Sequence, residues 1–226
     1  AAVNVSLSNP MVTQTPDGEK VEQTAAFANT VANYQLTYTA EHSADGTRIL
    51  SDSWGWKQGY VPLGMTGPSQ ENWYYQAFFN WEFDDESLHL RTAKLRMVRE
   101  SGQSGMVEYT WEMPNASVSI RFAMTDGSDK LLMFGEYEPK EDIESSTLTF
   151  SCYPAFFSPP RERAVTTALG TRRPGDRILL DLEQEKWVLY EDTSRPGQGS
   201  AGMVLGTPDA FSSVRIPVSH YGIVTT

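Results

Sequence analysis

The sequence contains very little cysteine and no long apolar run. Cys152 is the only cysteine among 226 residues, so no disulfide can form within the chain, and redox chemistry does not indicate a compartment. Because Cys152 lies where apolar and polar residues alternate, we expect a small buried side chain rather than a nucleophile. No apolar run approaches the roughly 20 residues of a membrane-spanning helix, so a membrane partner is not expected.

Compact catalytic motifs are absent as well. The chain has no G-x-S-x-G elbow, no phosphate-binding loop, no G-x-G-x-x-G after a predicted strand, no H-E-x-x-H and no paired C-x-x-C. Its three histidines, His42, His89 and His220, are far apart and lack the spacing of a metal site, so neither a metal nor a cofactor is expected. His89 is expected on the surface, whereas His220 stands at a strand entry after Pro217 and is a candidate ligand-binding residue.

Positive charge is scarce, with 18 lysines and arginines against 29 aspartates and glutamates and a net charge of −11. Phosphate backbones and anionic membranes would repel such a protein, so nucleic acid is not an expected partner. With this many carboxylates some pair is close together in any fold, so abundance alone does not indicate a glycosidase-like acid and base. The apolar share of 39% is that of a globular protein, and the chain is long enough to bury a core.

The clearest pattern is the alternation of apolar and polar residues between Ser117 and Tyr153. Asp126-Gly127 predicts a turn from a first strand into a second strand over Lys130–Tyr137, and a third strand follows at Thr147–Tyr153. Three neighbouring strands with one apolar face each need a second layer, which predicts a β-sandwich. Side chains of a strand alternate between its faces, so four apolar residues of the first strand share one face: Val118, Ile120, Phe122 and Met124.

The same rhythm predicts at least ten strands and almost no helix. Glu19–Val31 fits either a short helix or a strand with a bulge. We therefore predict an all-β fold, a large antiparallel two-sheet sandwich that forms a single domain over residues 1–226. The further strands are expected at Val3–Leu7, Tyr34–Thr39, Trp73–Phe83, Ser87–Met97, Val107–Met113, Ala201–Leu205, Val214–Ile216 and Tyr221–Thr225, with a hairpin of Arg177–Leu182 and Lys186–Tyr190.

Two segments supply aromatic side chains that could meet a ligand. Ser51–Pro68 is rich in glycine and is predicted to be a loop that carries Trp54 and Trp56. Such a loop either closes the open end of the sandwich or offers flat faces that stack on sugar rings. Trp73 and Tyr74 begin a central strand with large rings on both faces, and its second face is expected to border a groove.

Arg121 is the most informative charged residue. It points away from the apolar face of a predicted central strand and lies between Ser119 and Ala123. It therefore either pairs with a carboxylate, for which Glu136 on the next strand is a candidate, or lines a polar groove and binds ligand oxygens. The proline-rich loop that follows the third strand adds Tyr153 and Arg161 as further candidate ligand-binding residues.

The meander resembles the galactose mutarotase-like supersandwich. The resemblance rests on Ile120-Arg-Phe, Asp126-Gly, Leu131-Leu-Met-Phe and Leu148 to Phe157, within a strand order similar from about Tyr34 to Thr225. It implies a carbohydrate-binding or carbohydrate-processing protein. The mutarotases use a histidine pair and a glutamate around the sugar, but this chain has no histidine in the meander or in the loop after it, so that catalytic set is not carried over. The alternative is a non-catalytic structural or protein-interaction module.

The two chain ends suggest where the protein is located and whether it belongs to a longer polypeptide. Ala1-Ala-Val-Asn4 fits the new end left by cleavage after a small-residue site, which would place the protein in the periplasm or outside the cell; an arbitrary chain boundary would look the same. Strand-like residues at the other end fit a piece of a longer polypeptide. The sequence specifies neither a particular saccharide nor an oligomeric state.

Overall fold

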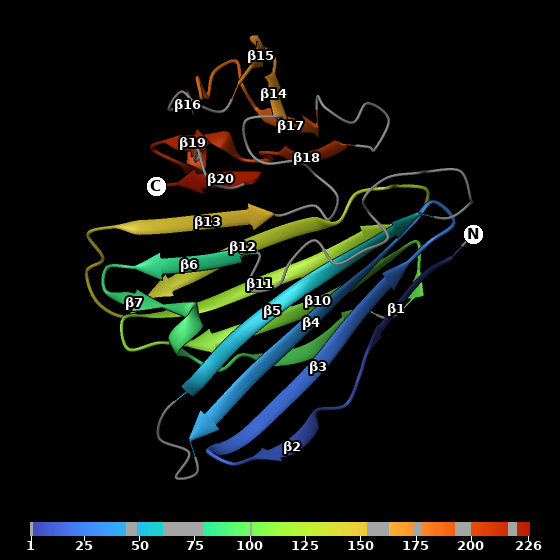
Figure 1. Cartoon of the computed structure of the whole chain (residues 1–226), viewed down its shortest axis with the longest axis vertical. Coiled ribbons are helices and arrows are strands. Elements are labelled where there is room, and N and C mark those ends of the chain that lie inside the picture. Colours follow the sequence, from blue (N-terminus) through green and yellow to red (C-terminus); the bar gives the residue numbers. More distant parts are fainter. Residues whose placement is uncertain are drawn as a thin grey trace.

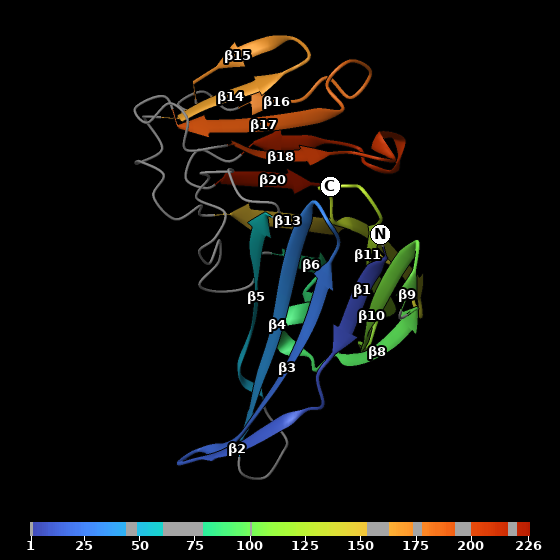
Figure 2. The same cartoon turned by 90° about the vertical axis from the view of Figure 1, so that its right-hand side faces the viewer.

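The protein is described by a computed structural model that covers residues 2–43, 49–60, 79–99, 101–152, 163–173, 178–192, 200–216 and 221–226. These residues form twenty strands in four antiparallel sheets, with short 3₁₀ turns such as η2 (Leu88–Leu90) and η4 (Pro208–Ala210). The predicted all-β, sandwich-like fold class is confirmed. Figure 1 shows the arrangement, and Figure 2 shows it from the side.

Sheet I contains the N-terminal strands in the order β5-β4-β3-β1-β9, with β2 paired to β3. The segment that fitted either a helix or a strand is a strand, because it pairs along its whole length with β4. The bounds are β1 Val3–Leu7, β2 Met11–Thr15, β3 Gly18–Ala28, β4 Ala32–Ser43, β5 Ile49–Tyr60 and β9 Ser101–Gly102.

Sheet II contains four strands in the order β12-β11-β10-β8 and lies opposite sheet I (Figure 2). The predicted Asp126-Gly127 turn is confirmed: Gly127 has φ of +70°, a conformation that glycine adopts without strain. The bounds are β8 Lys94–Arg99, β10 Ser104–Glu112, β11 Ala116–Thr125 and β12 Leu132–Pro139.

Sheet IV lies at the upper end of the molecule in Figure 2, and sheet III continues below it from β20 through β13 to β6. Sheet III has the order β16-β19-β20-β13-β6-β7, and sheet IV has the order β15-β14-β17-β18. The bounds are β6 Phe79–Phe83, β7 Glu86–Ser87, β13 Ser146–Cys152, β14 Arg163–Thr167, β15 Gly170–Arg172, β16 Ile178–Leu179, β17 Trp187–Asp192, β18 Ser200–Val204, β19 Val214–Ile216 and β20 Tyr221–Thr225.

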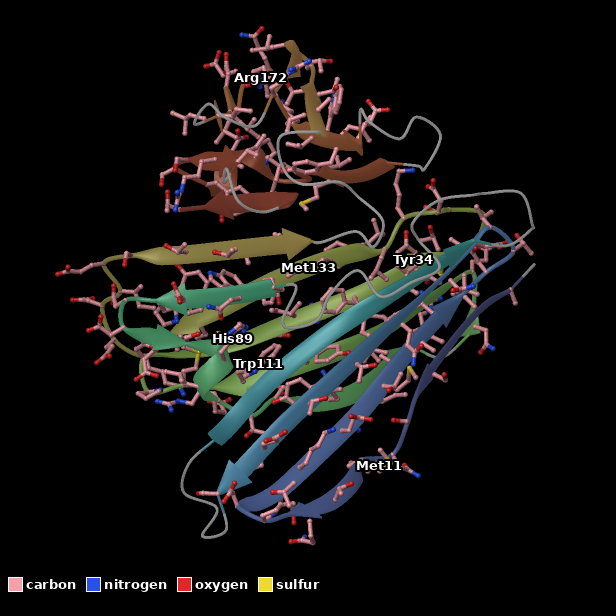
Figure 3. The ribbon with its side chains drawn as sticks, in the orientation of Figure 1. Met11, Tyr34, His89, Trp111, Met133 and Arg172 are labelled. Atoms are coloured by element: carbon pink, nitrogen blue, oxygen red, sulfur yellow. The ribbon has the colours of Figure 1, made fainter. Side chains whose placement is uncertain are left out.

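The core lies between sheet II and the other sheets. Figure 3 labels one of its members, Trp111 of β10, and Arg172 marks the end of the molecule opposite Met11. One cluster of buried apolar side chains includes residues of all four sheets. The predicted inner face of β11 is confirmed, because all four of its apolar side chains are buried: Val118, Ile120, Phe122 and Met124.

Two glycines let the layers approach closely. A Cβ on Gly105 of β10 would lie 2.0 Å from Cγ2 of Val5, and a Cβ on Gly135 of β12 would lie 2.9 Å from Cζ3 of Trp81. Trp81 also meets the ring of Tyr137 with a centroid distance of 5.6 Å. Sheet II therefore packs against β1 at one end of its inner face and against β6 at the other.

The third strand of the predicted meander lies in another layer. β13 pairs with β6 and β20 of sheet III, not with β12, so the prediction of three neighbouring strands was wrong. The reason is a clamp at the turn after β6, where Asp84 accepts hydrogen bonds from the backbone N–H of Ser145 at 2.8 Å and of Glu144 at 3.3 Å. This clamp directs the chain after β12 across to sheet III.

Three other predicted elements need correction. Ser51–Tyr60 was expected in a loop but belongs to β5, which pairs with β4 at eleven positions; the glycines there did not prevent pairing. The strand predicted at Ser87–Met97 begins as the 3₁₀ turn η2, and only β8 is extended. The predicted hairpin of Arg177–Leu182 and Lys186–Tyr190 does not form, because β16 pairs with β19 and β17 pairs with β14 and β18.

The close approach of β1 to β10 gives a first prediction. Gly105→Ala should lower the free energy of unfolding by about 1–3 kcal/mol, because the new methyl group would meet a branched side chain on a buried strand. Gly206→Ala is the matched control, since a Cβ at Gly206 would have no heavy atom within 4 Å. Chemical denaturation measures both variants. Equal stability of the two variants would contradict the packing of Val5 on Gly105.

Candidate functional site

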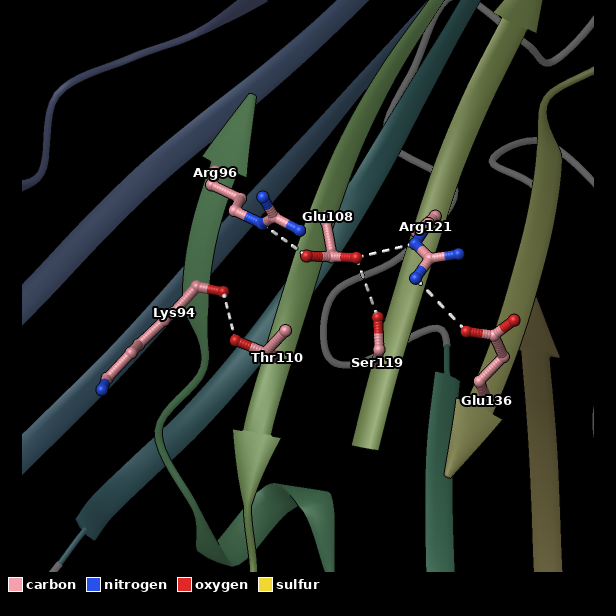
Figure 4. A network of polar contacts seen from close by, with 7 residues as sticks. All are labelled: Lys94, Arg96, Glu108, Thr110, Ser119, Arg121 and Glu136. Atoms are coloured by element: carbon pink, nitrogen blue, oxygen red, sulfur yellow. Dashed lines mark hydrogen bonds and ion pairs between the residues drawn. The ribbon is translucent and has the colours of Figure 1, made fainter. Parts of the chain in front are cut away.

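The candidate site is the outer face of sheet II. Because residues along a strand alternate between faces, burial of the apolar residues of β10 and β11 sends the intervening residues outward. The strand register then places Arg96, Glu108, Arg121 and Phe134 opposite one another across the four strands. Figure 4 shows the polar part of this row.

Glu108 is the centre of the row and is buried although it belongs to the outer face, with 4% of its side chain exposed. Its Oε1 accepts a hydrogen bond from Nε of Arg96 at 2.5 Å. Its Oε2 accepts from Nε of Arg121 at 2.7 Å and from Oγ of Ser119 at 3.1 Å. Both carboxylate oxygens are thus satisfied by neighbouring strands, which is the condition for burying a charge.

These donors also decide the ionisation of Glu108. Burial by itself would raise its pKa, but the hydrogen bonds from Arg121, Arg96 and Ser119 outweigh burial and hold the pKa below the ordinary value of 4.5. Glu108 is therefore a carboxylate at neutral pH. It can orient guanidinium groups, but it does not hold a proton to donate as a general acid.

Arg121 links Glu108 to the neighbouring strand. Its Nη2 lies 3.2 Å from Oε2 of Glu136, which confirms the partner expected from the sequence. The hydrogen bond to Glu108 raises the pKa of Arg121, and about a third of the side chain, 35%, is exposed. The alternative that Arg121 pairs with a carboxylate is therefore confirmed, and its binding of ligand oxygens stays a prediction.

Two arginines of this row are only partly engaged. Arg96 contacts Glu108 through Nε and its side chain is 68% exposed. In the part of the chain that the structure describes, the terminal Nη groups of Arg96 and Nη1 of Arg121 have no partner. Guanidinium groups held in this way present oriented donors to an external carboxylate or hydroxyl.

An apolar patch adjoins the arginines. Phe134 lies directly opposite Arg121 in the β11–β12 register and is 48% exposed. Leu132, two residues earlier on the same face, is 39% exposed and lies opposite Ala123. The face thus combines an accessible aromatic ring with charged planar groups, a combination suited to binding a partly polar ligand.

Two other predicted site residues belong to a different sheet. The backbone positions of Trp54 and Trp56 lie on β5 of sheet I, opposite Tyr38 and Leu36. The remaining candidates lie outside the described residues: Trp73, Tyr74, Tyr153, Arg161 and His220.

Glu108 and Phe134 are functional candidates that the sequence argument missed. Both lie at outward positions of alternating segments, so their face could be read from the sequence. Their contact with Arg121 depends on the register of β10, β11 and β12, and the turn between Glu112 and Ala116 sets part of that register. If the segment between Glu112 and Ala116 had been predicted as the turn of a hairpin, the register would have identified Glu108 as a partner of Arg121.

His89 differs from its expected place on the surface. Its ring is half-buried, and Nε2 lies 3.2 Å from the carbonyl oxygen of Phe79. Burial lowers the pKa of His89, although the Phe79 carbonyl and the charge of Glu82 act in the opposite direction. These contacts attach η2 to β6 and account for the position of the ring without a ligand.

A second buried polar cluster connects the strands of sheet IV. Glu185 accepts hydrogen bonds from Oγ1 of Thr167, from Nη2 of Arg172 and, at 2.9 Å, from the backbone N–H of Asp181. Its hydrogen bond from the Asp181 N–H spans the turn before β17. Its carboxylate oxygens are occupied by partners within the chain, so we assign it a structural role.

Metal and membrane sites were also sought among the described residues. No group of three or more His, Cys, Asp or Glu side chains there is arranged to hold a metal ion. Within the same residues, no helix has the length and apolar character needed to cross a membrane.

Comparisons with family models, with curated proteins and with solved structures found no match for this chain.

The ionisation of Glu108 gives a second prediction. Its folded-state pKa is lowered, so the stability that it adds is complete above its unfolded pKa and is lost as the pH falls through the folded value. Glu108→Gln should therefore lower the free energy of unfolding at neutral pH by about 1–3 kcal/mol, and should reduce the loss of stability of the wild type on acidification below about pH 5.

Denaturant unfolding at a series of pH values measures both effects. Glu138→Gln is the matched control, because Glu138 is an exposed glutamate of the same sheet. An identical acid dependence for wild type and Glu108→Gln would show that Glu108 is not a stabilising carboxylate.

Proposed function

We propose that the protein binds saccharides on the outer face of sheet II. The observation that carries this proposal is the partly exposed side chain of Arg121, held by Glu108 at 2.7 Å and Glu136 at 3.2 Å, beside the exposed ring of Phe134. A sugar has an apolar ring face and an edge of hydroxyl groups, so a binding face needs an aromatic surface and planar donors and acceptors together.

The ion pairs favour binding because they fix the donors in advance. An arginine on a free surface loses side-chain entropy when a ligand immobilises it. Arg121 is held through Nε and Nη2, and Arg96 is held through Nε, so both lose less freedom when a ligand arrives. The resemblance of the meander to the galactose mutarotase-like supersandwich supports the same class of ligand.

We propose binding without assigning a reaction. Glu108 is ionised, so it has no proton to donate as an acid, and the two arginines that bind its oxygens stabilise the charged form and weaken it as a base. The histidine pair of the mutarotase catalytic set has no counterpart in the meander. The geometry of this face therefore supports recognition more directly than catalysis.

A second candidate function rests on β12. In the described residues it is one of the two edge strands of sheet II, and it carries the exposed side chains of Leu132, Phe134 and Tyr137. An exposed edge can pair with a strand of another protein. Glu136, Glu138 and Pro139 on the same strand oppose such pairing, so we place this protein-interaction role second.

Substitutions on the face test saccharide binding. Phe134→Ala and Arg121→Lys should each weaken binding of a saccharide found by glycan-array screening by about tenfold, because they remove the stacking surface and the guanidinium fork. Val204→Ala, on sheet IV, is the control for loss of an exposed apolar side chain. Isothermal titration calorimetry measures the affinities, and denaturation confirms that each variant folds.

Two results would count against the proposal. One is the absence of binding to any saccharide on the array. The other is a saccharide whose affinity is the same for wild type, Phe134→Ala and Arg121→Lys. Concentration-dependent self-association or capture of an extended peptide, lost on substitution of Leu132 or Tyr137, would support the role of the β12 edge instead.

A further inference from the structure

The outer face of sheet II includes a basic strip in an otherwise acidic protein. β8 has the sequence KLRMVR, and its three basic residues, Lys94, Arg96 and Arg99, are all exposed. The strand contains no acidic residue, although acidic residues outnumber basic ones by 29 to 18 in the whole chain. Arg121 extends this basic strip onto β11, two strands away.

We infer that the ligand of this face is an anionic saccharide that carries carboxylate groups, such as a uronic acid polymer. This inference rests on the proposed saccharide binding and names its ligand class. Planar carboxylates match the paired donors of a guanidinium, and two guanidinium groups with unengaged terminal nitrogens project from this face. They belong to Arg96 and Arg121.

The separation of the two arginines fits a polymer with spaced charges. Arg96 and Arg121 lie opposite the same residue, Glu108, from the strands on either side of β10. Their backbones are therefore two strand spacings apart, about 10 Å. This separation is similar to the length of one disaccharide, so acidic groups that recur along a polysaccharide can meet both guanidinium groups at once.

The basic strip keeps a net positive charge after its ion pairs with Glu108 and Glu136 are subtracted. Glu108 pairs with Arg96 through Oε1 and with Arg121 through Oε2, and Glu136 pairs with Arg121, so these two carboxylates offset two of the four basic residues of the strip. The acidic residues of β12, Glu136 and Glu138, lie on the side away from β8. We therefore expect one carboxylate of the ligand to meet β8 and another to meet Arg121 on β11, with a sugar ring against Phe134.

The same distribution disfavours nucleic acid. A nucleic acid carries a charge at every nucleotide, and its backbone would meet the acidic residues of β12 as well as the overall charge of −11. A polysaccharide that alternates acidic and neutral sugars places charge over the arginines and an uncharged ring over Phe134. The face therefore fits a spaced anion better than a dense one.

The test compares one oligosaccharide in two charge states. Isothermal titration calorimetry with a hyaluronan oligosaccharide, in which uronic acid and neutral sugars alternate, and with its methyl ester should show at least about tenfold tighter binding of the acid form, and this difference should shrink as salt is raised. Arg96→Gln and Lys94→Gln should each weaken binding of the acid form and leave that of the ester nearly unchanged. Lys94→Gln leaves the Glu108 contacts intact, so it separates charge from folding.

Arg215→Gln is the matched control, since Arg215 is an exposed arginine of sheet III. Equal binding of acid and ester would overturn the inference and leave saccharide binding standing. Binding of neither form would count against the anionic ligand, and failure across the whole glycan array would overturn the proposed function itself. Equally tight binding of single-stranded DNA of the same charge would show a general polyanion site and would also overturn the inference.

Discussion

The fold depends on the burial of one face of sheet II against two other sheets. Its inner side chains meet sheet I near Val5 and sheet III near Trp81, and a glycine allows the close approach at each place. Removing this apolar surface from water is the main favourable term in forming such a layered structure. The same constraint fixes the other face, because strict alternation leaves only outward positions for the charged residues of β8, β10 and β11.

On the outer face of sheet II, alternation places a carboxylate on a middle strand. A glutamate on the middle strand is covered by its neighbours, and an uncompensated buried carboxylate would be costly. Glu108 avoids this cost because Arg96 and Arg121 reach it from opposite sides and Ser119 supplies a third donor. The ion pairs thus stabilise the sheet and also orient the groups that we propose bind a ligand, so stability and recognition share the same residues.

The sequence predicted the faces of strands better than their partners. Alternation is a local property, and it located the buried face of β11, the outward position of Arg121 and the pairing of Arg121 with Glu136. Which strands pair depends on distant contacts such as the Asp84 clamp on Ser145, and no local pattern records them, so β13 was placed in the wrong layer. Glu108 was missed for the same reason, since its role depends on register. The aromatic residues of β5 were assigned to a loop because glycine was taken as a sign of a turn, although pairing with β4 outweighs the preference of single residues.

The placement of β13 between β6 and β20 has a consequence for how the chain folds. Leu148 pairs with Trp81 on one side and with Thr225 on the other, so sheet III joins segments that are far apart in the sequence. Contacts of this kind form slowly, because a long loop must close before any pairing energy is gained. During synthesis sheets I and II can assemble from the first part of the chain, whereas β13 keeps an unpaired edge until β20 has left the ribosome. That interval is when the protein is most exposed to pairing with the wrong strand.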